Sequence, residues 1–279
     1  MANTQDLRRR IKSIKNTRQI TRAMEMLAAT ERRRAQDAVL AGRAYADRAI
    51  EVLQAASQAD PSVRHPLLER RPVKKRGIAV FTSDRGLAGA LNANVMKAAL
   101  AETSNVTFIP VGRKGAEMLK RQERPVLEAF TGIGDRPTYE QIQPIAEHIR
   151  DAFISGRVDE VTVVYPKFIS TLRNEPTAVR LLPAEPPEAD ASGSQAQTLF
   201  EPDAETVLES LLPKLVEIQL WQAMLETKAS EHSSRMVAMQ NASRNASDLI
   251  DDLTLQYNQV RQAVITTEIA EIASAAAVD

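Results

Sequence analysis

Apolar side chains recur at steps of three and four residues near both ends of the chain. The first stripe runs through Leu7, Ile11, Ile14, Ile20, Met24 and Leu27 and continues through small residues to Leu53. The last one runs through Ala246, Leu249, Leu253, Tyr257, Val260 and Val264. This spacing is typical of amphipathic α-helices, and stripes this narrow are typical of a coiled-coil seam rather than of a globular core.

The distribution of glycine and proline sets the length of these helices. Residues 1–60 hold only Gly42 and no proline, and neither residue type occurs after Pro213. We therefore predict one long helix over residues 1–58 and another over 203–279. At the usual rise per residue they span roughly 80 Å and about 100 Å, which exceeds what a compact domain of this length needs.

The middle of the chain, residues 75–196, alternates short apolar runs with helical patterns. Strands are expected at Gly77–Thr82, Val106–Val111, Val161–Tyr165 and Thr177–Leu182, and helices at Ala88–Thr103, Lys114–Arg121 and Pro137–Gly156. Apolar strands separated by helices predict an α/β domain, Rossmann-like, on a mostly parallel sheet. The fold class is therefore α/β with long helices, in which an antiparallel coiled coil of the N- and C-terminal helices accompanies this central domain.

The end of the middle region contains the strongest helix breakers. Pro183–Ala196 holds three prolines and little apolar content, which indicates a surface loop. Asp203 is the expected N-cap of the last helix. Pro213 lies a few turns further on and is expected either to kink that helix or to end a first short one.

Charge distinguishes the two long helices, although the whole chain is neutral with 36 basic and 36 acidic residues. Residues 1–50 carry twelve Lys or Arg against five acids, whereas residues 214–279 carry five against nine. Opposite signs favour pairing of the two helices with each other. The basic face of the first helix is alternatively a nucleic-acid patch, but it almost lacks aromatic residues, and we predict no nucleic-acid partner.

Composition also limits which other classes of protein this chain could belong to. The chain has no cysteine and three dispersed histidines, which leaves little material for a metal centre. No apolar run approaches the roughly 20 residues of a membrane span, so no direct membrane insertion is expected. The arginine-rich start lacks the apolar stretch of a signal peptide, and a soluble intracellular protein is the expectation.

The loop Ser83–Gly89 is the most tempting chemical site. A glycine-containing turn from a strand into a helix is able to bind phosphate through backbone N–H groups. However, Ala90 and Leu91 stand where a P-loop carries Lys and Ser or Thr, and a dinucleotide fingerprint is absent. A tight structural turn and a nucleotide-binding loop remain open at this point, and Gly112–Gly115 raises the same question. Acidic residues on the helices form no convincing acid–base set, and we predict no catalytic, cofactor-binding or metal-binding residue.

Four segments resemble the gamma subunit of rotary, proton-translocating (F-type) ATP synthases, in the order in which that family carries them. They are Ile11–Ala29 of the opening helix, Ser83–Asn92 of the turn after the first strand, and Glu231–Ala242 and Ile265–Ile272 of the closing helix. Ala88, Ala90 and Ala275 depart from the residues common in that family, but alanine is well tolerated in helices.

The resemblance implies a non-catalytic central rotor stalk that couples ion-driven rotation of a membrane ring to ATP synthesis or hydrolysis in a catalytic ring. It implies contacts with the alpha and beta subunits, with the epsilon subunit and with the c-ring. Contacts with the beta subunit and its hydrophobic collar are implied for Met24, Arg235, Gln262, Thr266 and Glu268, and a contact of the foot with the c-ring for Glu201.

The same resemblance implies no cofactor on this chain, because Mg-ATP is bound by the partner subunits. It also implies a peripheral protein on the cytoplasmic side of a bacterial inner membrane. Two rival classes are a free coiled-coil scaffold, which would form homodimers, and a nucleotide-binding enzyme, which would bind phosphate at Ser83–Gly89. Neither rival explains why two oppositely charged helices flank an α/β insert.

Overall fold

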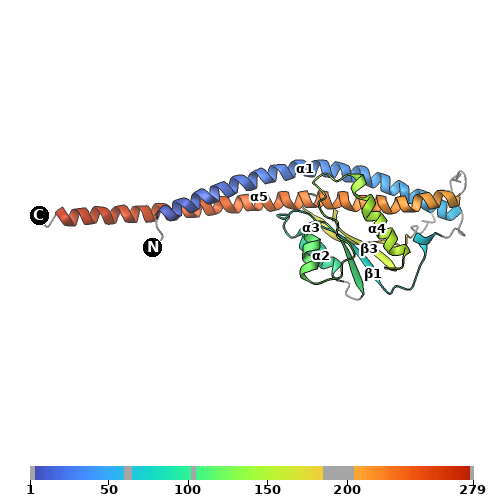
Figure 1. Cartoon of the computed structure of the whole chain (residues 1–279). Helices are drawn as coiled ribbons and strands as arrows, with labels where there is room; N and C mark the ends of the chain where they lie inside the picture. The colour runs from blue at the N-terminus through green and yellow to red at the C-terminus, as the bar shows by residue number, and fades with distance from the viewer. Residues whose placement is uncertain (1–3, 60–64, 102–104, 185–203, 277–279) are drawn as a thin grey trace. The chain divides into compact units, whose positions relative to one another are not determined.

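The computed structural model describes residues 4–59, 65–101, 105–184 and 204–276. Its two longest elements are the helices α1, Thr4–Ala59, and α5, Ala204–Ala276 (Figure 1). Both helices were predicted from the scarcity of glycine and proline, and both are confirmed. Asp203, predicted as the N-cap of the second helix, and most of the predicted loop after Pro183 lie outside the described residues.

The region between the long helices folds as a sheet with helices. Its elements are η1 Pro66–Leu68, β1 Arg76–Phe81, α2 Leu91–Ala99, β2 Val106–Val111, α3 Arg113–Arg121, η2 Tyr139–Gln141, α4 Gln143–Ile154, β3 Glu160–Phe168 and β4 Asn174–Leu182.

The chain divides into two compact units. We call residues 1–28 together with 235–279 the terminal unit, and residues 29–234 the central unit. Both α1 and α5 contribute residues to each of them.

The terminal unit is a pair of helices. Leu7 and Ala28 of α1 are buried, as are Ala246, Ile250 and Leu253 of α5. The Arg18 guanidinium donates a hydrogen bond to Ser247 Oγ at 3.4 Å. Because small residues recur in this seam, the helices approach closely, as the apolar stripes predicted.

The central unit is built on a four-stranded sheet with the strand order β2-β1-β3-β4. β1 pairs in parallel with both β2 and β3, whereas β4 runs antiparallel to β3. The prediction of a mostly parallel sheet is confirmed. β4 is antiparallel because only a short turn joins it to β3, and a parallel partner needs a long crossover.

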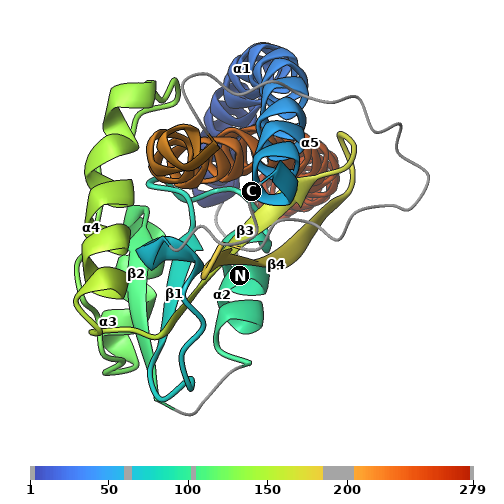
Figure 2. The ribbon, with the colours of Figure 1, turned by 90° about the vertical axis from the view of Figure 1, so that its right-hand side faces the viewer.

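Helices cover both faces of this sheet (Figure 2). Ile78 and Val80 of β1 face one layer, where they cluster with apolar residues of α2 and α3. Their neighbours Ala79 and Phe81 cluster with residues of α4 and α5 on the opposite face. Residues alternate between the faces of a strand, so β1 is apolar throughout because it is covered on both sides. The first part of α5 is therefore one of the helices that cover the sheet.

Two details differ from the sequence-based expectation. The helix predicted over Pro137–Gly156 is divided into η2 and α4, and Pro144 lies in the first turn of α4, where its missing N–H costs nothing. Pro213 does not end a short helix, because α5 continues through it. Leu212 and Leu215 beside it are buried in the core, and this packing offsets the lost backbone hydrogen bond.

Candidate coupling interface

A buried carboxylate on α5 joins three elements of the central unit. Glu226 is 2% exposed. Its Oε1 accepts hydrogen bonds from Arg43 Nε at 2.9 Å and from Gln222 Nε2 at 3.2 Å, and its Oε2 accepts one from the backbone N–H of Phe168 at 2.7 Å. Arg43 also donates to the carbonyl oxygen of Phe168 at 2.8 Å. The set ties α1, α5 and the end of β3 together, and we call Arg43, Glu226 and Phe168 the clamp.

A glycine of α1 faces α5 next to the clamp. A Cβ on Gly42 would come within 2.4 Å of Gln222 Oε1 and 3.0 Å of Leu225 Cδ1. Next to it, Val39 is fully buried and packs with Leu225 and Ala229. Both atoms that face Gly42 are the ends of flexible side chains, so a larger residue there would displace these side chains beside the clamp.

A second buried ion pair follows within the next two turns of α5. Lys228 Nζ is 3.1 Å from Glu231 Oε2, and the two side chains are 5% and 1% exposed. Lys228 also donates to the carbonyl oxygen of Ile133 at 3.2 Å. This lysine fastens the loop before η2 to α5, since a buried ammonium needs such partners.

A third tie connects α5 with η2 and α4 through Glu217. Its carboxylate accepts from the Tyr139 hydroxyl at 2.6 Å and from Lys214 Nζ at 2.8 Å, and Arg150 Nη1 lies 3.5 Å away. Burial by itself would raise the pKa of Glu217, but the hydrogen bonds from Lys214 and Tyr139 lower it below its usual value. Burial, followed by the bond to Glu217, raises the pKa of the Tyr139 hydroxyl, which stays neutral.

The loop at Ser83–Gly89 uses its polar groups internally. Asp84 Oδ1 accepts from the backbone N–H groups of Arg113 at 2.9 Å and Gly132 at 3.2 Å. Lys114 N donates to the carbonyl oxygen of Ser83 at 3.0 Å. Of the two readings left open above, these bonds favour a structural turn, because a bound phosphate would need these donors at the start of α3.

Two positions near this loop are occupied by glycine because a side chain there would clash with Thr82. The φ of Gly112 is +114°, and a Cβ there would lie 2.1 Å from the carbonyl oxygen of Thr82. A Cβ on Gly115 would come within 2.8 Å of Thr82 Oγ1, which accepts the Gly115 N–H. The two glycines therefore permit close packing of α3 on β1.

In the part of the chain that the structure describes, no three His, Asp or Glu side chains are placed so that they could share a metal ion. None of the helices described there combines the length and the apolar character that a membrane crossing requires.

The predicted partner-contact residues all lie in the terminal unit, except Glu201, which falls outside the described residues. Met24 on α1 is half-buried, and Arg235 on α5 is buried at 7% exposure. Gln262, Thr266 and Glu268 are exposed on α5. Since Gln262 follows Arg235 by 27 positions, the two are separated by about 40 Å along the helix. The structure therefore divides these residues into two groups.

Helix geometry further separates the exposed group. Gln262 and Thr266 are four residues apart and share a face, whereas Glu268 lies about 120° around the helix from Gln262. Ile265 and Ile269, which are 44% and 61% exposed, lie next to the first pair. Thr266 Oγ1 donates to the carbonyl oxygen of Gln262 at 2.9 Å within the helix. We call Gln262, Ile265, Thr266 and Ile269 the mixed face.

Comparison with known proteins covers nearly the whole chain. A protein-family model described as ATP synthase matches residues 3–278. The ATP synthase gamma chain of Opitutus terrae is 44% identical over 289 residues, with 99% of this chain and 98% of the relative covered. That of Roseiflexus castenholzii is 48% identical over 287 residues, with the same coverage. The chain belongs to the ATP synthase gamma-chain family.

Solved structures agree on the fold of a gamma chain. A chain of the Euglena gracilis mitochondrial ATP synthase rotor superposes with a TM-score of 0.68 at 18% identity, covering 94% of this chain and 98% of that one. A chain from the central stalk and c-ring of the Tetrahymena thermophila enzyme gives 0.61 at 23% identity, covering 80% and 99%. As a gamma chain, the protein is a non-catalytic subunit of the ATP synthase central stalk and binds no cofactor itself.

The clamp was missed in the sequence analysis of this gamma chain. Glu226 looks like any acidic residue of a long helix, and Arg43 is one of twelve basic residues near the start of the chain. The only signal was the single glycine beside it, Gly42, in an otherwise glycine-free helix. A lone glycine inside a long helix has a steric or functional reason often enough to be examined.

Proposed function

We propose that this chain is the rotor that transmits rotation between a c-ring and a ring of alpha and beta subunits. The observation that carries the proposal is that α5 is one unbroken helix. Its first part covers the sheet of the central unit, and its last part carries the exposed mixed face. A single helix thus contributes both to the sheet-bearing unit and to the mixed face.

In this proposal the terminal unit meets the beta subunits. Met24 faces a lever segment of a beta subunit. Arg235, Gln262, Thr266 and Glu268 meet beta-subunit loops and the hydrophobic collar. The exposed isoleucines of the mixed face support this assignment, since exposed apolar groups next to polar ones are typical of protein contacts.

The central unit is proposed as the foot. It rests on the c-ring and holds an epsilon subunit, with Glu201 near the c-ring loops. The clamp and the Lys228–Glu231 pair support this role, because they fasten the foot to both long helices with hydrogen-bonded buried charges.

Coupling then follows from unequal contacts. A rotor without threefold symmetry touches three chemically identical beta subunits differently and biases each toward a different nucleotide affinity. Mg-ATP is held by those subunits, and the complex lies on the cytoplasmic face of a bacterial inner membrane as a peripheral assembly.

Reconstitution tests the proposal. The purified chain is added to separate alpha and beta subunits, and size-exclusion elution and ATP hydrolysis are followed. We expect one copy to join a six-subunit ring and to raise multisite turnover. A chain that elutes alone and leaves the hydrolysis rate unchanged would refute the rotor role and favour the free coiled-coil scaffold.

A further inference from the structure

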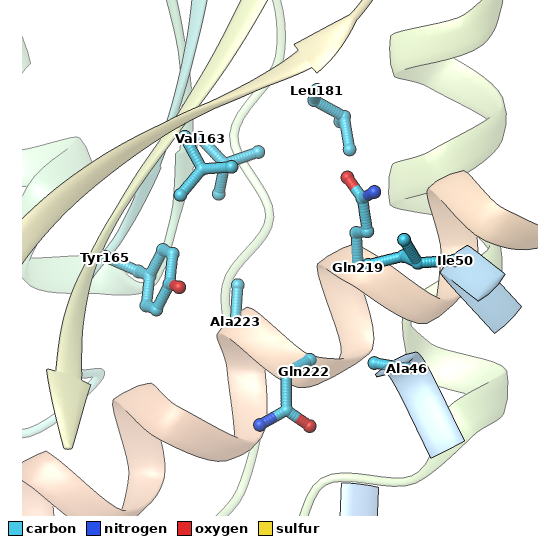
Figure 3. Close-up of a pocket in the computed structure, with 9 residues that line it drawn as sticks. Ala46, Ile50, Val163, Tyr165, Leu181, Gln219, Gln222 and Ala223 are labelled. Atoms are coloured by element: carbon cyan, nitrogen blue, oxygen red, sulfur yellow. The ribbon is translucent and has the colours of Figure 1, made fainter. Parts of the chain in front are cut away.

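One stretch of α5 is covered on all sides within the central unit. Every residue from 223 to 233 is buried, although several of them are charged. A helix that only lies on a sheet keeps an exposed polar face, and this one has none over about three turns. At its start, Ala223 packs with Val163 of β3, and Tyr165 lies beside them (Figure 3). We call residues 223–233 the enclosed stretch.

The turn between β3 and β4 is bonded to both long helices at this level. Backbone hydrogen bonds within residues 170–173, at 2.9 and 3.2 Å, close the turn. Arg32 Nη1 of α1 donates to Thr171 Oγ1 at 3.2 Å. Asn174 Nδ2 donates to Ser234 Oγ of α5 at 3.0 Å. One closed turn therefore makes one side-chain tie to each helix.

The loop before η2 makes the same kind of connection. The Ile133 carbonyl oxygen accepts from Lys228 Nζ of α5 at 3.2 Å. Three positions later, Arg136 donates to both carboxylate oxygens of Glu31 on α1, at 2.7 and 3.2 Å. Two loops far apart in the sequence thus each bind α1 and α5.

These ties differ in kind from the packing between the helices. Apart from the clamp, α1 and α5 meet here through apolar side chains such as Val39, Leu225 and Ala229. Apolar contacts have no preferred direction. Hydrogen bonds have one, and Ser230 Oγ adds another by donating to the Pro166 carbonyl oxygen at 2.8 Å. The hydrogen bonds therefore fix how far each helix is rotated about its own axis.

We propose that the enclosed stretch is the grip by which the central unit turns α5, and that Thr171 and Asn174 are its positioning residues. The inference rests on the proposed rotor function and adds the place at which torque enters the helix. When the sheet turns, the ties of the two loops carry α1 and α5 with it. Without them, the helices can rotate within their cover, and part of the movement is lost.

The test removes both ties of the turn and leaves its backbone unchanged. Thr171→Val and Asn174→Leu are combined in one variant, because each nearly keeps the size of the side chain. Leu172→Ala, in the same turn and 82% exposed, removes neither tie and is the control. Thr171→Ser keeps the hydroxyl and is the conservative variant.

ATP hydrolysis and ATP-driven proton pumping are measured in the complete reconstituted complex. We expect the double variant to hydrolyse ATP at the wild-type rate but to pump about two- to tenfold fewer protons per ATP, as the loss of hydrogen bonds of this kind allows. Leu172→Ala and Thr171→Ser should keep the wild-type ratio. Urea unfolding of the full-length chain should change little in all three variants.

A wild-type ratio in the double variant would overturn the grip, while pumping by the wild type would still uphold the rotor function. A wild-type complex that does not pump would refute the rotor function and the grip with it. An equal loss in Leu172→Ala would also overturn the grip, because the turn would then act through a partner.

A crosslink decides the case in which the double variant is unstable. The chain has no cysteine, so Asn174→Cys and Ser234→Cys introduce a single pair of thiols. Dibromobimane joins such a pair in the purified chain before assembly. We expect the unjoined pair to lose pumping per ATP and the joined pair to regain it. A ratio that the crosslink does not raise would count against the grip.

Discussion

One helix behaves in opposite ways in the two units of the molecule. Every residue of α5 from 223 to 233 is buried in the central unit, whereas every residue from 261 to 270 is exposed in the terminal unit. Both stretches are rich in small and polar residues, so composition hardly distinguishes them. In the first stretch the sheet, its loops and α1 cover α5, and internal hydrogen bonds are made by the side chains of Glu226, Thr227, Lys228, Ser230 and Glu231.

This difference separates the side chains of α5 that stabilise the fold from those that are exposed to a partner. Burial in the central unit makes each side chain of α5 part of a core whose loss lowers the free energy of unfolding. Exposure in the terminal unit leaves side chains that contribute little to folding and are available to a partner. Substitutions in the two units test this division.

Phe81→Ala is expected to have the largest effect. Phe81 is fully buried in β1 and clusters with residues of α4 and α5. Its truncation leaves a cavity and should lower the free energy of unfolding by about 4 kcal/mol. Urea unfolding followed by circular dichroism measures the change. Leu172→Ala, at a position that is 82% exposed between β3 and β4, is the control, and an equal loss in both variants would contradict the assigned core.

Glu226→Ala should destabilise by about 3 kcal/mol, because it leaves the Arg43 guanidinium and the Phe168 N–H without their acceptor. Thermal and urea unfolding of the single and double Ala variants at Glu226 and Arg43 give the coupling energy. Glu175→Ala removes an exposed partner of Arg173 and serves as the control. Additive losses at Glu226 and Arg43 would show that the clamp is not a coupled unit.

Glu217→Gln should cost about 1–2 kcal/mol near neutral pH, since it weakens charged hydrogen bonds. The folded-state pKa of Glu217 is lowered from the usual 4.5. Its ionised form therefore adds stability that is complete above pH 4.5 and is lost as the pH falls through the lowered value. Melting temperatures measured down an acid series should fall less steeply for Glu217→Gln than for the wild type. Parallel curves would exclude Glu217 as a source of acid sensitivity.

The double substitution of Gln262 and Thr266 by alanine should change the free energy of unfolding by less than about 0.5 kcal/mol. In the reconstituted complex, however, it should impair ATP-driven proton pumping. Glu268→Gln, outside the mixed face, tests whether the mixed face is the larger contributor. Normal pumping by the double variant would remove the mixed face from the proposed beta-subunit contact.

Arg235 is less suitable for that comparison. It is buried, so its removal is expected to lower stability as well as to affect any contact with a partner. A loss of pumping in Arg235→Ala would therefore have two explanations, which unfolding measurements on the isolated chain separate. A change in pumping without a change in stability would support the contact role.

Much of this fold was predictable because its signals are local. The near-absence of glycine and proline predicted α1 and α5, and apolar runs such as Val106–Val111 predicted the strands. The antiparallel course of β4 was not predicted, although the short connection after Phe168 contained the reason. Of the two alternatives predicted at Pro213, the end of a short helix was wrong. The burial of its neighbours, which keeps the helix continuous, is a property of the tertiary structure and not of the local sequence.

The site was less predictable for a physical reason. Arg43 and Glu226 are 183 positions apart, and no local pattern indicates that an acid in a long helix becomes buried. Family resemblance supplied Gln262, Thr266 and the other contact residues, and their roles remain predictions. The structure adds that they fall into two groups, and that Glu268 lies on a different side from its neighbours.

The continuity of α5 also makes the number of its residues a functional quantity. Each residue inserted into an α-helix turns everything beyond it by about 100° and advances it by about 1.5 Å. An insertion between Arg235 and Gln262 would thus rotate the mixed face about the helix axis relative to Arg235, even if every side chain were kept. Substitutions in this stretch keep the residue count, whereas a single insertion or deletion would, under the proposed function, change the side of α5 on which the mixed face meets a beta subunit.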